Sequence, residues 1–341
     1  MIENFLGNPA AAAVFDHMIR DRRISQTILL AGPEGVGKAT LARRFAAALL
    51  GDPAKIERDD LFLSENASVI TERERWTAEK RNEDPLLFAS HPDFVTFAPD
   101  GPLRQISIQQ MRLLKERAQY KPLRGDWRVF LIDHIDRANE QAANSLLKTL
   151  EEPPSHLVLI MTAENAYDLL PTIRSRAVIF QMNPLGEQEM EAFAQARGLT
   201  DAPHRMALAS GSPGAALSLD LEAYEKRRAA MLTLLQVASS GAPFAKWTKY
   251  SESIGASKSE KLEYYLKVLY VLLEDLLILH HTGGKIRNSD IRRELEAIAP
   301  AVSFEWLYAA VRKVDELAEL LRRNIQKSIA LDALAVGLRA L

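Results

Sequence analysis

A glycine-rich turn, GPEGVGKAT at residues 32–40, follows a short apolar run and precedes a helical pattern. Glycines let backbone N–H groups turn inward onto phosphate oxygens, the start of a helix adds partial positive charge, and a lysine supplies a full charge. A strand, this turn and a helix in succession predict a phosphate-binding loop in an α/β fold. The candidate nucleotide-binding residues are Gly32, Pro33, Glu34, Gly35, Val36, Gly37, Lys38, Ala39 and Thr40.

The loop departs from the complete pattern G-x-x-x-x-G-K-[ST] at one position. Ala39 occupies the place of the hydroxyl that binds Mg²⁺, and Thr40 follows one residue late. One residue along a helix rotates a side chain by roughly 100°, so Thr40 is expected to point away from such an ion. The sequence therefore predicts a degenerate loop. Mg²⁺ is not expected there, and weak binding of ATP or ADP is left open.

Five short apolar runs, rich in β-branched or aromatic residues, predict a parallel five-stranded sheet buried on both faces. Helical patterns lie between them. Ser107 and Gln110 have the spacing of a capping box, and residues 138–151 carry one apolar face before Pro153 stops the helix. The predicted strands are Thr27–Ala31, Phe94–Phe97, Val129–Asp133, Leu157–Thr162 and Val178–Gln181.

After about Gln181 the sequence shows helical periodicity without a convincing strand pattern. The clearest helix is predicted at residues 259–281, and one small domain is not expected to cover its wide apolar stripe fully. We therefore predict three domains: a P-loop core at residues 1–181, a small helical lid at 182–219 and an all-helical C-terminal domain at 220–341. The stripe contains Leu266, Leu269, Tyr270, Leu273, Leu276 and Leu277.

A second candidate site lies at the end of the third predicted strand. An apolar strand ending in Asp, here Asp133, can place a carboxylate beside a bound metal ion, as a Walker B strand does. The next position would hold Glu if the site activated water, but it holds His134. Thr162, at the end of the fourth strand, could be a polar sensor beside the phosphates. Because the hydroxyl at position 39 is also missing, hydrolysis is not expected.

The composition excludes several other kinds of site. The 341 residues include no Cys, which rules out disulfides, thiolate nucleophiles and Cys-based zinc or iron–sulfur sites. A formal net charge of -2 excludes a strong nucleic-acid field over the whole molecule. No segment reads as a membrane span or signal peptide, so a cytoplasmic location is expected. Residues 72–84 hold nine charges and are interpreted as a solvated helix or mobile loop.

Two further segments have residue sequences that are more distinctive than an amphipathic helix requires. Residues 144–154 read NSLLKTLEEPP, and residues 170–177 read LPTIRSRA. Together with GPEGVGKAT and VFLIDHID they resemble the bacterial clamp-loader AAA+ family, and within it the delta-prime type of DNA polymerase III subunit. In motifs the resemblance covers residue 1 to about residue 220.

This resemblance implies a clamp-loader subunit that helps load the sliding clamp onto primed DNA during replication. The implied partners are motor subunits of the gamma/tau type and a delta subunit in a hetero-pentamer, with the sliding clamp and primer-template DNA contacted through the complex. The C-terminal domain would be the collar that holds the ring together. The chain would belong to a holoenzyme that is a DNA-directed DNA polymerase, a nucleotidyltransferase, with little or no ATPase activity of its own.

The resemblance also assigns a role to Arg176. The family's Ser-Arg-Cys element reads Ser175-Arg176-Ala177 here, which implies that Arg176 is an arginine finger acting in trans on ATP held by the neighbouring motor subunit. Gly214 stands where active relatives carry a sensor arginine. The four-Cys zinc module of many relatives is missing, so no zinc is expected and no cofactor is required.

Two other functions remain as alternatives. One is an active clamp-loader-type ATPase, against which Ala39, His134 and Gly214 argue together. The other is a small-molecule kinase on a P-loop scaffold. A kinase needs phosphate-clamping arginines in its lid, and residues 211–214 offer none.

Overall fold

The computed structural model describes residues 2, 5–239, 241–257, 261–281, 284–320 and 326–341. They form two compact units. The first unit runs up to Thr200 and includes Gly211–Ala215, and the second comprises Asp201–Ser210 and the chain from Ala216 onward. The three predicted domain limits, 1–181, 182–219 and 220–341, stay a prediction.

A five-stranded sheet with the order β2-β3-β4-β1-β5 forms the centre of the first unit, and every neighbouring pair of strands is parallel. This confirms the predicted α/β class and all five strands. β3 begins and ends one residue earlier than expected, and β4 continues one residue further. The strands are β1 (Thr27–Ala31), β2 (Phe94–Phe97), β3 (Arg128–Ile132), β4 (Leu157–Ala163) and β5 (Val178–Gln181).

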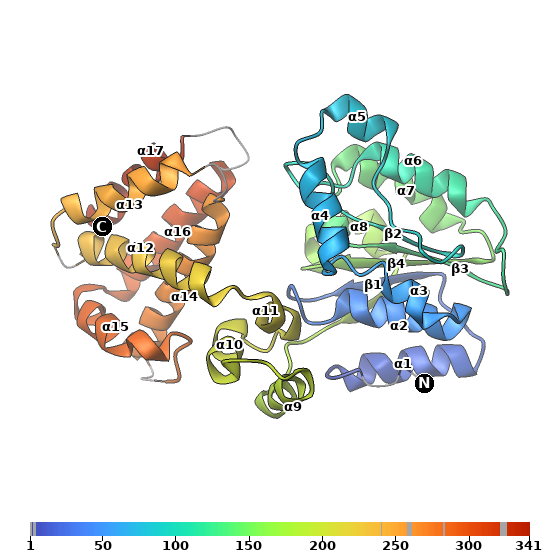
Figure 1. The fold of residues 1–341 in the computed structure, drawn as a ribbon, viewed down its shortest axis with the longest axis horizontal. Coiled ribbons are helices and arrows are strands. Elements are labelled where there is room, and N and C mark those ends of the chain that lie inside the picture. The colour runs from blue at the N-terminus through green and yellow to red at the C-terminus, as the bar shows by residue number, and fades with distance from the viewer. Residues whose placement is uncertain (1, 3–4, 240, 258–260, 282–283, 321–325) are drawn as a thin grey trace. The chain divides into compact units, whose positions relative to one another are not determined.

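Helices cover both faces of the sheet (Figure 1). Phe15 and Phe45, from α1 and α2, pack on one face, and Met111 and Leu146, from α6 and α7, pack on the other. The predicted capping box at the start of α6 is confirmed. The helices up to residue 197 are α1 (Pro9–Arg20), α2 (Lys38–Leu50), α3 (Pro53–Glu57), α4 (Ser64–Arg73), α5 (Ala78–Glu83), α6 (Ile108–Ala118), α7 (Glu140–Glu151), α8 (Pro171–Arg174) and α9 (Glu187–Arg197).

The prediction that the strands are buried on both faces is wrong for β5. Val178 is 46% exposed and Ile179 is 43% exposed. The strand pairs with β1 and lies at the edge of the sheet. An apolar run alone cannot distinguish an edge strand from a central strand, because strand order is decided by crossovers between distant segments.

The charged segment at residues 72–84 is only partly what the sequence indicates. Most of its side chains are exposed, but Arg73 is 3% exposed. Its guanidinium donates to both carboxylate oxygens of Asp100 and to Oδ2 of Asp84. The segment is therefore anchored by a buried arginine, and the prediction of a solvated helix or mobile loop is wrong at Arg73.

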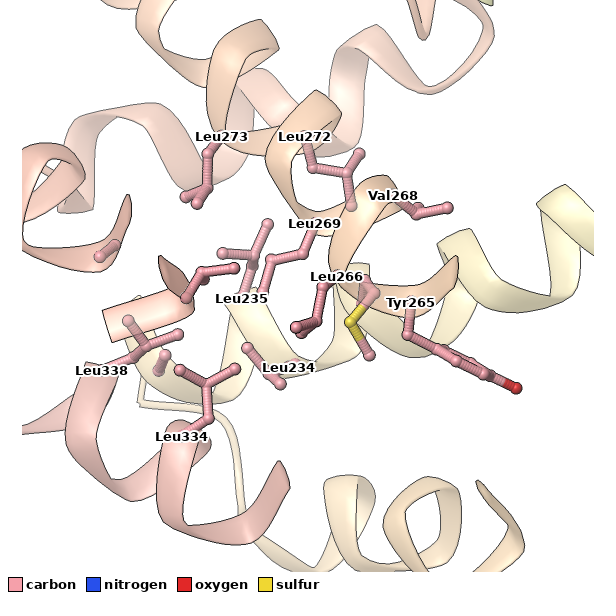
Figure 2. Packing of buried hydrophobic residues seen from close by; sticks show 14 of the residues in the cluster. Leu234, Leu235, Tyr265, Leu266, Val268, Leu269, Leu272, Leu273, Leu334 and Leu338 are labelled. Carbon is pink, nitrogen blue, oxygen red and sulfur yellow. The ribbon is translucent and has the colours of Figure 1, made fainter. Parts of the chain in front are cut away.

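The second unit is all-helical, as predicted, and has a hydrophobic core of its own (Figure 2). Leu266, Leu269, Leu273 and Leu276 of the predicted stripe are buried in a cluster with residues of α12, α16 and α17, whereas Tyr270 and Leu277 are only partly buried. The unit therefore covers most of the stripe and leaves these two residues incompletely covered. Residues 259–260 of the predicted helix lie outside the described residues. The remaining helices are α10 (Ala202–Ala209), α11 (Pro213–Ser218), α12 (Leu221–Ser239), α13 (Ala245–Ala256), α14 (Leu262–His281), α15 (Arg292–Ile298), α16 (Phe304–Leu320) and α17 (Lys327–Arg339).

Among the described helices, none combines the length and apolarity needed to cross a membrane.

Candidate functional site

The glycine-rich turn joins β1 to α2. Gly35 has a φ of 77° and Gly37 a φ of 101°, in the left-handed region that other residues rarely adopt. Helix α2 begins directly after Gly37, at Lys38. The first N–H groups of any helix lack acceptors within the helix. The turn therefore keeps the backbone features on which the prediction of a phosphate-binding loop rests.

The ammonium group of Lys38 is bound to the turn itself. Its Nζ donates to the carbonyl oxygens of Gly32 at 2.5 Å and Pro33 at 2.8 Å, and the residue is buried. Burial lowers the pKa of Lys38, and the carboxylates of Asp133 and Glu164 act in the opposite direction. The charge that the sequence assigns to phosphate recognition is thus engaged by carbonyl groups of the loop.

The predicted fold family implies that Mg²⁺ binds together with ATP. That ion would need an oxygen ligand at position 39, and the side chain there has none. Mg²⁺ takes oxygen ligands, whereas the methyl group of Ala39 packs against the cluster that contains Phe15 and Phe45. Thr40 is half-buried one residue further along α2. The residues of this loop therefore do not fit a magnesium–nucleotide complex held in the usual way, and they supply no step that depends on the metal ion.

The structure brings Asp133, His134 and Thr162 together. Ile132 of β3 pairs with Met161 of β4, so the next residue on each chain segment lies beside the other. The hydroxyl of Thr162 donates to Oδ1 of Asp133 at 2.5 Å and accepts the backbone N–H of His134 at 2.8 Å. Asp133 follows β3 directly and does not belong to the strand, which corrects the predicted end of that strand by one residue.

Two acidic residues that the sequence analysis missed lie beside His134. Single ligand atoms of His134, Asp136 and Glu164 all lie within 4.8 Å of one another. Nδ1 of His134 is 4.0 Å from Oδ1 of Asp136. The order of residues along the chain could have predicted this proximity. Asp136 follows β3 and Glu164 follows β4, and neighbouring parallel strands end at the same edge of a sheet. The result is a concentration of negative charge close to Lys38.

Residues 212–214 pack on the glycine-rich turn. The hydroxyl of Ser212 donates to the carbonyl oxygen of Glu34 at 2.7 Å, and the N–H of Gly214 donates to that of Gly35 at 2.8 Å. A Cβ at position 214 would lie 2.9 Å from the Cα and the carbonyl oxygen of Gly35. Close packing against the loop therefore requires a glycine at position 214, where the resemblance places a sensor arginine in active relatives.

The guanidinium of Arg176 is hydrogen-bonded to partners outside the glycine-rich turn. Its Nη2 lies 2.6 Å from Oε1 of Glu151, and its Nη1 donates to the carbonyl oxygen of Thr172 at 2.9 Å. These partners lie on α7 and α8. Within the described part of the chain, its hydrogen bonds go to neither the glycine-rich turn nor Asp133.

Comparisons with protein families match both parts of the chain. A family model described as DNA polymerase III, delta subunit, matches residues 7–186. A second model, described as DNA polymerase III, delta subunit, C terminal, matches residues 222–336.

Similar curated proteins carry related names. DNA polymerase III subunit delta' of Escherichia coli (strain K12) is 29% identical over 236 residues, 68% of this chain and 69% of that protein. The protein of the same name from Pseudomonas aeruginosa is 32% identical over 207 residues, 59% of this chain and 57% of that protein. Among solved structures, a DNA polymerase III gamma subunit-related protein from Thermotoga maritima shows 18% identity and a TM-score of 0.46, covering 96% of this chain and 98% of that one.

Proposed function

Because this chain belongs to the delta-prime family of DNA polymerase III subunits, which are clamp-loader AAA+ proteins, we propose that it serves in a clamp-loader complex that places the sliding clamp on primed DNA during replication. The observation that carries the proposal is the match of two family models for DNA polymerase III delta subunits. One matches residues 7–186 and the other, for the C-terminal part, matches residues 222–336. The proposed partners are gamma/tau-type motor subunits and a delta subunit, with the clamp and DNA reached through the complex.

Within that complex we assign this chain a role without ATP hydrolysis. Lys38 is bound by carbonyl groups of its own loop, and position 39 offers a methyl group where the metal ion needs an oxygen. His134 replaces the carboxylate that would activate water. These features support a subunit that requires no cofactor, holds no Mg²⁺, and binds ATP or ADP weakly if at all. The absence of cysteine argues against zinc.

The all-helical second unit is proposed as the collar. Its core is separate from that of the first unit, with buried leucines contributed by α12, α14 and α17 (Figure 2). A helical unit with its own core can hold subunits together independently of nucleotide. Co-purification of the full-length chain from native extract should recover the other DNA polymerase III subunits, and purification without them would contradict the partner assignment.

Hydrolysis is tested on the isolated protein. Steady-state turnover of ATP should stay below about 0.1 s⁻¹, under the usual enzyme range of ~1–10³ s⁻¹. Faster turnover that Lys38→Ala abolishes would show an active ATPase instead.

The catalytic contribution to the neighbour is assigned to Arg176. A guanidinium presented across a subunit boundary stabilises the charge that develops on the γ-phosphate, and such fingers are worth roughly 10³–10⁵-fold in the best cases. In the reconstituted complex, Arg176→Ala should lower DNA- and clamp-stimulated ATP hydrolysis. The decrease should be smaller than in those cases, because the motor subunits also supply fingers to one another.

Arg174→Ala is the matched control. It removes the same charge two residues away, where the guanidinium stacks 4.8 Å from the ring centre of Tyr167. Equal losses from the two substitutions would indicate general electrostatics, and no loss from Arg176→Ala would remove the finger assignment.

A further inference from the structure

Arg176 has both terminal nitrogens engaged within its own chain. Nη1 donates to the carbonyl oxygen of Thr172 at 2.9 Å and to the hydroxyl of Ser175 at 3.2 Å. Nη2 donates to Oε1 of Glu151 at 2.6 Å. Of these three acceptors, Glu151 alone carries a charge.

The position of Glu151 is fixed by the fold. It is the last residue of α7, which is anchored by the buried side chains of Leu146 and Leu150, and Pro153 follows shortly after. Because proline cannot continue the helix, the carboxylate stays at the helix end, next to the segment after α8. The ion pair thus ties the segment that carries Arg176 to a rigid element of the first unit.

A carboxylate on this guanidinium competes with a phosphate. An arginine recognises both anions through the same planar set of N–H groups. The side chains are 32% and 49% exposed, so the pair can open without disturbing the core. Exposed ion pairs bias an equilibrium by at most about five-fold. Glu151 can therefore bind the guanidinium of Arg176 when no phosphate is near and give it up when a phosphate competes for it.

We infer that Glu151 is a positioning residue that keeps Arg176 bonded within its own subunit, and so restrains ATP hydrolysis by the neighbouring motor subunit when DNA and clamp are absent. This inference rests on the proposed function of Arg176 as a finger in trans. Assembly on DNA and clamp would bring the neighbour's ATP close enough for its phosphate to displace the carboxylate.

The test is Glu151→Gln in the reconstituted clamp loader, with ATP hydrolysis measured without DNA or clamp. The substitution keeps the size of the side chain and removes its charge. The expected result is a higher kcat, by at most about five-fold, with an unchanged KM, because a larger fraction of complexes has the arginine available. The rise stays below that bound to the extent that motor sites served by other fingers contribute to the rate. With saturating DNA and clamp, the variant and the wild type should have the same rate. A merely structural role would not raise the unstimulated kcat alone.

Glu152→Gln is the matched control. It removes the same charge from the next residue, whose side chain is exposed, and it should leave both rates at wild-type values. An equal rise with Glu152→Gln would mean a general charge effect and would overturn the inference. The same holds if Glu151→Gln raises the unstimulated rate in an Arg176→Ala background, because the effect would then not act through the arginine.

Failure of the inference is distinguishable from failure of the proposed function. If Arg176→Ala lowers stimulated hydrolysis while Glu151→Gln leaves the unstimulated kcat unchanged, the finger stands and the restraint is overturned. If Arg176→Ala changes nothing, the proposed finger itself is wrong and the restraint is overturned with it.

Discussion

The hydroxyl of Thr162 donates a 2.5 Å hydrogen bond to Oδ1 of Asp133 and accepts the N–H of His134 at 2.8 Å. Three residues that the sequence singled out for three different reasons are thus joined through one oxygen atom. The contact ties the ends of two neighbouring strands together. It also supports His134 in a left-handed conformation, with a φ of 58°.

Thr162→Val should lower the free energy of unfolding by about 1–3 kcal/mol, because it leaves a carboxylate oxygen and a backbone N–H without their partner. Chemical denaturation monitored by circular dichroism measures this change. Thr96→Val is the control. Thr96 is fully buried on β2, and its Oγ1 has no hydrogen-bond partner among the described residues. That substitution should be neutral or stabilising, and an equal loss from both would contradict the role of the Thr162 hydrogen bonds.

Gly214→Ala should destabilise the first unit by about 1–3 kcal/mol, the usual range for overpacking. The added Cβ would lie 2.9 Å from the backbone of Gly35, so one of the two segments must move. Gly337→Ala makes the same change inside α17, where the Cβ would meet the Lys313 side chain at 3.5 Å. It should stabilise by about 0.5–1 kcal/mol, because glycine is a poor helix former. Denaturant unfolding measures the change in the free energy of unfolding for each variant. Changes of opposite sign would support the packing explanation, and changes of the same sign would refute it.

Arg73→Met should cost about 3–5 kcal/mol of stability, since it leaves the buried carboxylate of Asp100 without its cation. Arg75→Met removes the same charge from an exposed position two residues later and should have little effect. Thermal unfolding of both variants measures the difference. Similar melting temperatures for the two would show that the buried pair contributes nothing specific.

Stability at high pH should depend on Tyr224. Burial raises the pKa of Tyr224 to about 12, and its hydroxyl donates to Oδ1 of Asn288 at 2.9 Å. An unfolded tyrosine has a pKa of about 10. Between about pH 10 and 12 the unfolded chain therefore loses this proton first, so the free energy of unfolding falls as pH rises. Tyr224→Phe should remove this contribution to the slope of stability against pH, and an unchanged slope would contradict the assignment.

Local patterns predicted much of the first unit. The five strands, the capping box at Ser107 and the helix that ends at Glu151 all depend on residues within a few positions of one another. Predictions that depended on neighbours distant in the sequence were less successful. The strand β5 proved to be an exposed edge, and Arg73 proved to be buried. The stripe on α14 proved to be buried at Leu269 and only partly buried at Tyr270.

The class of fold, the glycine-rich turn and the missing hydroxyl at Ala39 follow from the amino-acid sequence, because side-chain periodicity, glycine content and residue identity are local properties of the chain. The groups that bind the functional residues become known from the folded structure. Glu151 and Arg176 are 25 positions apart, and Ser212 and Glu34 are 178 apart, yet each pair is hydrogen-bonded. Such partners depend on how packed elements bring distant segments within about 3 Å, and no spacing in the sequence encodes that distance.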